Sequence, residues 1–194
     1  SEMQIEFDID SLEQVSRAYG IRALPNESLT ASGRVSLVEE GIRTLEPLHA
    51  QTEAAEMSLD GLVTMQPGLL GSAVNFDVSG PSLSELVSHF ADVAGVPSED
   101  FELSGRLQID NDGYRFQDAA GSLGSTILGI DGLLVTGPGL GGSNFEFSIS
   151  GPSIEELLSD GLNLRVASGR FELSGRIDLH EDQVDLKNIV LNRD

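Results

Sequence analysis

The chain has 194 residues, a formal net charge of −21, 39% apolar residues and no cysteine. The negative charge argues against nucleic acid, whose phosphates require Lys and Arg, and against an anionic membrane surface. It is equally compatible with a salt-adapted source. The lack of cysteine excludes disulfides, zinc–thiolate sites and thiol nucleophiles. No segment approaches the ~18–20 apolar residues of a membrane-spanning helix, and residues 1–30 contain no basic stretch followed by an apolar run. We therefore expect an excised segment of a larger protein, with any signal or anchor outside it.

A strand, a capped helix and a second strand are predicted at the start of the chain. Residues 7–12 lead into the helix, because Ser11 and Gln14 fit the S-x-x-E/Q capping box, in which two side chains satisfy free backbone N–H groups. Residues 29–37 alternate between apolar and polar side chains, as in a strand with one buried and one solvated face. Glu39-Glu40-Gly41 then supplies a tight turn. The apolar side of the second strand holds Leu29, Ala31, Val35 and Leu37.

The middle of the chain contains a similar strand and helix. Apolar residues alternate through Val74, Phe76 and Val78, and Ser82 with Glu85 then forms another capping box. Beyond the cap, four apolar side chains fall at positions i, i+3, i+4 and i+7, which predicts one apolar stripe on the helix. These residues are Leu83, Leu86, Val87 and Phe90.

A further alternating strand is predicted at residues 101–109, with Gly105 among its apolar positions. A missing side chain there suits a bend or a close approach of another backbone. Asn111-Asp112-Gly113 predicts a tight turn into a return strand, and two more strands are expected at residues 125–135 and 143–150. The apolar side of the first of these strands holds Phe101, Leu103, Leu107 and Ile109.

The C-terminal part repeats the helix entry and the alternating strand. Ser153 with Glu156 forms a capping box, residues 171–179 alternate, and Glu181-Asp182-Gln183 stands at the position of the turn. The apolar side of this strand holds Phe171, Leu173, Ile177 and Leu179.

These patterns recur at a spacing of about seventy residues. Residues 76–83 return as 147–154 at an offset of 71, residues 101–107 return as 171–177 at an offset of 70, and a diverged copy begins at Phe7. Such a period predicts stacked units that bury a continuous core between neighbours. We therefore predict an α+β, mainly β fold: a repetitive antiparallel curved sheet with one short capped helix per repeat. The predicted units of this one sheet are residues 1–71, which are diverged, residues 72–142, and residues 143–194, which are truncated.

Three patterns suggest specific chemistry, and each has a simpler explanation. Residues 137–142 match G-x-G-x-x-G, but a strand is predicted after them, whereas a dinucleotide site requires a helix. Residues 110–113 offer oxygen ligands for calcium, yet a turn explains them. The histidines His49, His89 and His180 occupy unrelated repeat positions and accompany no nucleophile motif. We therefore expect no catalytic residue, cofactor or metal.

Three arginines, Arg34, Arg106 and Arg176, share one position on the polar side of the alternating strands. One interpretation is a ladder that contacts lipid headgroups or a partner. The interpretation that we favour is a cross-strand ion pair with Glu102 or Glu172 on a solvated face.

The order of these motifs resembles the AsmA family of Gram-negative envelope proteins. The matching features are F-x-x-S-G-P-S-x-x-E-L at residues 76–86, F-x-L-S-G-R-L at 101–107 and D-G-Y-R-F at 112–116. Residues 1–71 depart from the pattern, since Gly-Pro is missing before their helix and Phe is missing before Ser32-Gly33-Arg34. The resemblance implies a protein anchored in the inner membrane with a long periplasmic repeat region. Its curved sheet would carry phospholipid towards the outer membrane along an apolar trough, without catalytic residues.

The first functional hypothesis is a non-enzymatic, lipid-binding or lipid-conducting repeat segment that serves outer-membrane biogenesis. Its partners would be phospholipid, or another acyl-chain lipid, and the neighbouring repeats of the same parent chain. Exposing a sixteen-carbon tail to water would cost about 13 kcal/mol, so a carrier needs a continuous apolar path. Alternation identifies the apolar side of the sheet but does not decide whether that side is open. The residues predicted to line the path are Val35, Leu37, Phe76, Phe101, Leu103, Leu107, Ile109, Phe147, Phe171, Leu173, Ile177 and Leu179.

Two other functions fit the same sequence. The chain is alternatively a structural or scaffolding envelope repeat that contacts other proteins and has no lipid path. A third interpretation is an acidic adhesin module stabilised by calcium.

Overall fold

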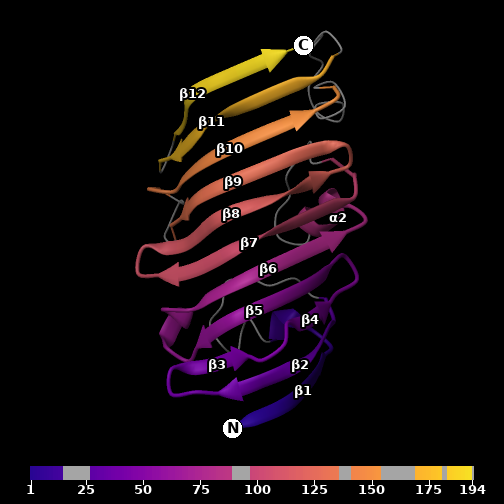
Figure 1. Ribbon diagram of the computed structural model, residues 1–194, viewed down its shortest axis with the longest axis vertical. Coiled ribbons are helices and arrows are strands. Elements are labelled where there is room, and N and C mark those ends of the chain that lie inside the picture. The colour runs from indigo at the N-terminus through magenta and orange to yellow at the C-terminus, as the bar shows by residue number, and fades with distance from the viewer. Residues whose placement is uncertain (15–26, 89–96, 136–140, 154–168, 181–182, 194) are drawn as a thin grey trace.

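The computed structural model describes residues 1–14, 27–88, 97–135, 141–153, 169–180 and 183–193. Its strands form one antiparallel sheet of 12 strands in the order β1-β2-β3-β5-β6-β7-β8-β9-β10-β11-β12, with β4 off this path and paired to β2 and β5. The strands stack from the N-terminus at one end of the molecule to the C-terminus at the other (Figure 1). The prediction of a mainly β, antiparallel fold is confirmed. The strands are β1 (Glu2–Ile9), β2 (Leu29–Leu37), β3 (Gly41–Thr44), β4 (Leu48–Gln51), β5 (Glu56–Thr64), β6 (Ala73–Gly80), β7 (Phe101–Asp110), β8 (Gly113–Leu123), β9 (Thr126–Leu134), β10 (Asn144–Gly151), β11 (Phe171–Leu179) and β12 (Val184–Arg193), and the short helices are η1 (Pro67–Leu69) and α2 (Leu83–Ser88).

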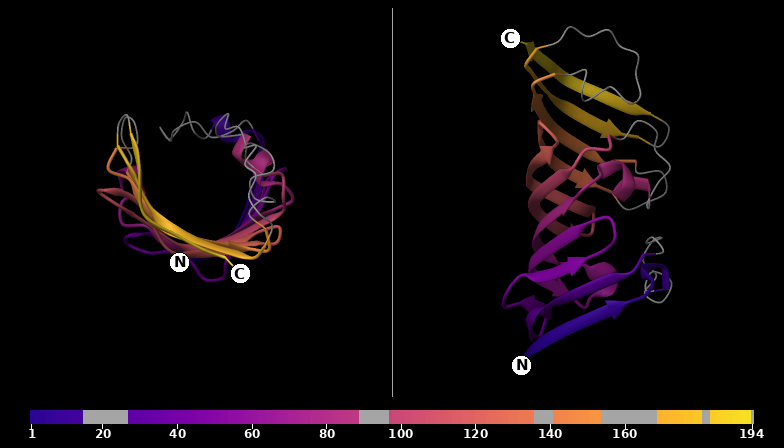
Figure 2. Two further views of the ribbon diagram at one scale, coloured as in Figure 1. Left: turned by 90° about the horizontal axis from the view of Figure 1, so that it is seen from above. Right: turned by 90° about the vertical axis from the view of Figure 1, so that its right-hand side faces the viewer.

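The strands bend along their length, so that the sheet forms an open arc when it is viewed along the stack (Figure 2). Helix α2 lies inside one rim of this arc. Two bulges contribute to the bend, because β8 and β12 each have two residues opposite a single glycine of the preceding strand. These glycines are Gly105 and Gly175, at positions where the sequence predicts a bend or a close approach.

The alternating patterns predicted the strands closely. Strands β2 and β11 have the predicted bounds, and β7 ends one residue later than predicted, at Asp110. Strands β9 and β10 lie within one residue of the segments expected at 125–135 and 143–150. Alternation works here because each strand has one apolar and one polar face.

The predicted capping box at Ser82 is formed on its N-cap side. The Glu85 N–H donates to Ser82 Oγ at 3.3 Å, and α2 begins at Leu83. Leu83 and Leu86 pack against a cluster of Ala55, Phe101 and Leu123, so the predicted apolar stripe faces the sheet. The predicted continuation at Val87 and Phe90, the helix expected after Ser153, and most of the helix expected after Ser11 lie outside the described side chains and residues.

The turn at residues 111–112 joins β7 to β8 as predicted. Asp110 Oδ1 accepts hydrogen bonds from the N–H groups of Asp112 and Gly113, at 2.8 Å and 3.2 Å. These hydrogen bonds close the turn, and they give the Asp110 carboxylate a structural role within it. The turn predicted at residues 39–41 also lies where expected, since Val38 and Gly41 exchange backbone hydrogen bonds around residues 39–40. Of the turn expected at residues 181–183, residues 181–182 lie outside the described residues.

The return strand after Gly41 is interrupted, which the sequence patterns did not indicate. It consists of two short strands, β3 and β4, separated by Leu45, Glu46 and Pro47. The N–H groups of Leu45 and Glu46 both donate to the Arg34 carbonyl oxygen, so the chain bulges away from β2 there. Pro47 has no N–H to offer a neighbouring strand, and it therefore suits this gap.

Candidate functional site

One face of the sheet carries a continuous line of apolar residues from β1 to β12. Residues directly opposite each other in an antiparallel pair point to the same face, so the register follows this line from strand to strand. Ten steps of ~4.8 Å between strands make it ~48 Å long. We call it the central row. It consists of Phe7, Ala31, Ala50, Met57, Val78, Leu103, Gly121, Leu128, Ile149, Leu173 and Leu191, each paired with the next.

The residues predicted to line a lipid path all belong to the face that contains the central row, which we call the apolar face. Leu103 and Leu173 lie in the row itself, and the others occupy parallel lines on either side, at even spacings along their strands. Beside the row lie Phe76 and Phe147, followed by Val35, Leu107 and Ile177 and then by Leu37, Ile109 and Leu179, while Phe101 and Phe171 lie on its other side.

The apolar face is the concave face of the arc. Leu83 and Leu86 of α2 contact Phe101 and Leu123, whose side chains belong to the apolar face. Because α2 lies inside the rim of the arc, that face points inwards (Figure 2). Among the described residues, this short helix covers one rim of the apolar face and does not extend along the central row.

The apolar face is only partly withdrawn from solvent. Phe101 and Phe171 are 5% and 1% exposed at the rim, whereas Leu103, Phe76 and Phe147 are half-buried and Phe7 and Leu191, at the two ends of the row, are each 46% exposed. The chain exposes 12177 Å² in total, compared with about 8,900 Å² expected for a globular monomer of its size. Within the described residues the strands form a single curved layer, and such a layer exposes more surface than a closed globule does.

Aromatic rings on the apolar face lie over glycines of neighbouring strands. Phe147 is directly opposite Gly175, and a Cβ atom added to that glycine would lie 3.1 Å from the Phe147 ring. Phe76 is opposite Gly105, and its ring meets that of Phe116 edge-to-face, with 6.4 Å between centroids. Glycine thus leaves room for rings to lie across the strands, which keeps the surface of the face apolar.

The arginine position that recurs in the alternating strands lies on the opposite, polar face. Arg34 pairs with Glu46 at 2.8 Å and with Glu2 at 3.5 Å. Arg176 Nε donates to Asp178 at 2.7 Å. The expected partners Glu102 and Glu172 were wrong for these two arginines.

The reason is the register. Glu172 lies opposite Ser150 and Asn192, whereas Arg176 lies opposite Glu146 and Lys187. A glutamate four residues along the same strand is ~13 Å away at 3.3 Å per residue, too far for an ion pair. Ion pairs on a solvated face nevertheless form, as the favoured interpretation expected.

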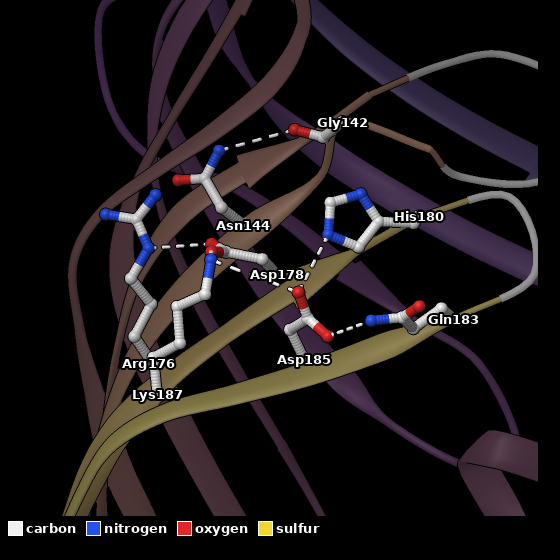
Figure 3. Close-up of polar contacts among 8 residues, drawn as sticks. All are labelled: Gly142, Asn144, Arg176, Asp178, His180, Gln183, Asp185 and Lys187. Atoms are coloured by element: carbon white, nitrogen blue, oxygen red, sulfur yellow. Dashed lines mark hydrogen bonds and ion pairs between the residues drawn. The ribbon is translucent and has the colours of Figure 1, made fainter.

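A polar cluster joins β11 to β12 on this face (Figure 3). Lys187 Nζ and Arg176 Nε hold the two carboxylate oxygens of Asp178, each at 2.7 Å, and these hydrogen bonds, that from Lys187 foremost, keep the pKa of Asp178 below its usual value. Asp185 accepts from Gln183 and lies 3.2 Å from His180 Nε2, and the contact with Gln183 above all lowers its pKa. The cluster fixes the register of the last two strands.

In the described part of the molecule, a hollow of about 340 Å³ is bordered by polar-face residues that include Glu56, Asp77 and Glu102. It is also lined by Met57, Val78, Leu103 and Gly121, four neighbouring members of the central row. The acidic side chains around this hollow do not suit an acyl chain, because an unpaired charge against apolar groups is costly. Within the described residues, no group of three or more His, Asp or Glu side chains is placed to hold a metal ion.

Two aspartates have a structural role that the sequence patterns did not reveal. Asp131 Oδ1 accepts from the Asp118 N–H at 2.7 Å, at the bulge of β8, and Asp60 accepts from Thr44 Oγ1 at 2.5 Å, beside the interruption between β3 and β4. Both belong to the matching Asp-Gly pairs at 131–132 and 60–61. The recurrence of Asp-Gly in the sequence was the available signal for this role.

The remaining motifs acquire no site. The element that follows the G-x-G-x-x-G motif is strand β10, as predicted, and residues 136–140 lie outside the described residues. His49 lies on β4 and His180 follows β11, far along the stack (Figure 1), and His89 lies outside the described residues.

Comparisons of the chain with protein-family models, curated proteins and solved structures found no match. No helix in the described ranges is long and apolar enough to cross a membrane.

Proposed function

We propose that the chain is a lipid-binding, lipid-conducting segment of an AsmA-like repeat protein of the Gram-negative envelope. The observation that supports this most is the central row, a continuous apolar line on the concave face. A row of ~48 Å exceeds the ~30 Å hydrocarbon core of a bilayer, so it is long enough for a complete acyl chain.

The physical argument concerns the cost of carrying an acyl chain through water. Each CH₂ group that is covered gains ~0.8 kcal/mol, and a gap in the apolar surface forfeits this gain for the atoms above it. The central row has no charged or hydrogen-bonding side chain between Phe7 and Leu191. Its half-buried residues, such as Leu103, have surface that a lipid tail could cover.

The proposed unit is a repeat of about seventy residues, of which the chain holds two full copies and part of a third. Recurrent contacts support this. Phe101 lies opposite Gly80 and Phe171 opposite Gly151, at offsets of 70 and 71. Each unit would extend the apolar face by the width of its strands, and the parent protein would sit in the periplasm with an inner-membrane anchor.

The experiment is site-specific photocrosslinking, in which protein that carries p-benzoylphenylalanine at one position is incubated with vesicles that contain a radiolabelled phospholipid and is then irradiated. Leu103 and Leu173 are the test positions, and their neighbours Ser104 and Ser174, which point to the polar face, are the matched controls. We expect lipid label at the two leucine positions and little at the two serines. Equal labelling at leucines and serines, or none at the leucines, would contradict the proposal, and the absence of label at every position favours the scaffolding alternative.

A further inference from the structure

Strand β12 forms the edge of the sheet, and although it carries Lys187 and a bulge, it is long and exposes several large apolar side chains. It has ten residues without proline, and Val184, Leu186 and Val190 are 61%, 63% and 50% exposed. Native edge strands are normally short, charged, bulged away or covered, because free N–H and C=O groups pair readily with another chain. With its length and its exposed apolar side chains, β12 offers both a free backbone edge and an apolar surface to another strand.

The backbone of β12 also has the shape of β8, a strand with neighbours on both sides. In β8, Asp118 and Ala119 stand opposite Gly105, and in β12, Asn188 and Ile189 stand opposite Gly175. The first residue of each pair has a positive φ, 50° at Asp118 and 53° at Asn188. Asparagine and aspartate tolerate this left-handed conformation better than most residues do.

In β8 this bulge is completed by the next strand. Strand β9 places Gly132 opposite Phe116 and Ile130 opposite Ala119, and between them Asp131 accepts the bulge N–H of Asp118 at 2.7 Å. In β12 the same places are occupied by Leu186, Asn188 and Ile189, with no strand beyond them in the described part of the chain.

We propose that the outer edge of β12 binds an antiparallel polypeptide strand that carries an apolar-Asp-Gly-apolar sequence. The glycine lies opposite Leu186, the preceding apolar residue lies opposite Ile189, and the aspartate accepts the Asn188 N–H. The added strand extends the central row beyond Leu191. This proposal rests on the β8–β9 pairing and not on the lipid function.

A second copy of the chain is a poorer occupant of this edge. In a twofold pairing of β12 with its own copy, the aspartate that β12 could offer to the Asn188 N–H is Asp185, which is already engaged by Gln183 and His180 within its own chain. Strand β1 of another copy runs parallel to β12, because the order of the sheet alternates over an odd number of strands. An antiparallel strand fits the antiparallel ladder that β11 and β12 continue.

The test uses the intact chain and a fluorescent peptide with the sequence of residues 126–134, followed by three lysines for solubility. We expect saturable binding by fluorescence anisotropy, and slower hydrogen exchange at residues 186–191 but not in β8. A matched peptide in which the aspartate is replaced by alanine should bind about tenfold more weakly, because one hydrogen bond to a charged acceptor is lost. A scrambled peptide with the same lysine tail controls for attraction to the acidic protein.

The protein variant Ile189→Lys provides a second test. Ile189 is exposed at the edge of the sheet, so the fold should tolerate the lysine, but the lysine would lie opposite an apolar residue of the bound peptide. It should weaken the binding of the 126–134 peptide. Equal affinity for the aspartate and alanine peptides, protection confined to β1 or β8, or a dimer that forms through β12 and excludes the peptide would each overturn the proposal.

Discussion

The ring of Phe101 lies across Gly80, its direct partner on the neighbouring strand β6. A Cβ atom added to Gly80 would lie 2.7 Å from Phe101 Cε1 and 2.5 Å from the carbonyl oxygen of Ala54. Phe171 and Gly151 repeat this arrangement, with 3.1 Å from the added Cβ to Phe171 Cε1. At this rim, the missing side chain of Gly80 therefore leaves the space in which the ring of Phe101 lies, and α2 packs on that ring.

Replacing Gly80 with valine should destabilise the protein, although valine is the better strand former. The added side chain must displace the Phe101 ring or the backbone at Ala54, and overpacking of this kind costs about 1–3 kcal/mol. Urea unfolding of Gly80→Val measures the loss. Ser79→Val, on the polar face of the same strand, is the matched control and should change the free energy of unfolding far less. Similar losses in the two variants would refute the seating of Phe101 on Gly80.

A charge in the central row should impair lipid binding more than it impairs folding. In Leu103→Asp, a carboxylate stands where an acyl chain would lie, and an unpaired charge against apolar groups is costly enough to weaken binding roughly tenfold or more. Leu103 is half-buried, so the fold should tolerate the change better than a fully buried site would. Binding of a fluorescent phospholipid, alongside thermal unfolding, separates these effects. Ser104→Asp adds the same charge to the polar face, and a comparable loss of binding in that variant would show that the apolar face is not the lipid site.

The faces of the strands could be predicted because they depend on a local period of two. Leu103 and Ser104 are assigned to opposite faces by their immediate neighbours, whatever strands lie alongside. The register could not be predicted in the same way. One extra residue in β8, where Asp118 and Ala119 stand opposite the single Gly105, shifts every pair beyond it, and an aspartate with a positive φ gives no signal as strong as a glycine would.

The partners of Arg34, Glu2 and Glu46, could not be predicted for this reason, since they depend on which residues other strands bring close. The partner of Arg176, Asp178, lies two residues away on the same strand. The sequence also could not predict how far the described residues of the apolar face are exposed to solvent. An alternating strand has the same pattern whether a second layer covers it or solvent does. The half-buried state of Phe76 and Phe147 depends on how the described strands are arranged in one sheet, which involves contacts between distant parts of the chain.

The hydrogen bond from the Asp118 N–H to Asp131 should stabilise the bulge of β8. In Asp131→Ala the N–H loses a charged acceptor at 2.7 Å, which should cost about 1–2 kcal/mol at this exposed position. Amide hydrogen exchange at Asp118 should become faster, and the thermal midpoint should fall. Asp131→Asn keeps an oxygen acceptor and should recover much of both effects. An unchanged exchange rate at Asp118 in the alanine variant would show that Asp131 is dispensable for the bulge.

The cluster around Asp178 should make part of the stability depend on acid pH. Hydrogen bonds from Lys187 and then Arg176 lower the pKa of Asp178 in the folded state, so its contribution is complete above its unfolded pKa of about 3.9 and is lost as the pH falls through the lower folded value. Asp178→Asn should therefore be less stable than the parent chain at pH 7, and the difference should begin to narrow as the pH falls below about 4. Urea midpoints at pH 7 and pH 3 measure it, and added salt should shrink it at pH 7 because the groups are close to solvent. Asp112→Asn removes the same charge from the exposed turn between β7 and β8 and corrects for relief of the overall negative charge. A difference between Asp178→Asn and the parent that persists unchanged at pH 3 would mean that packing, and not the ionised carboxylate, links β11 to β12 at this point.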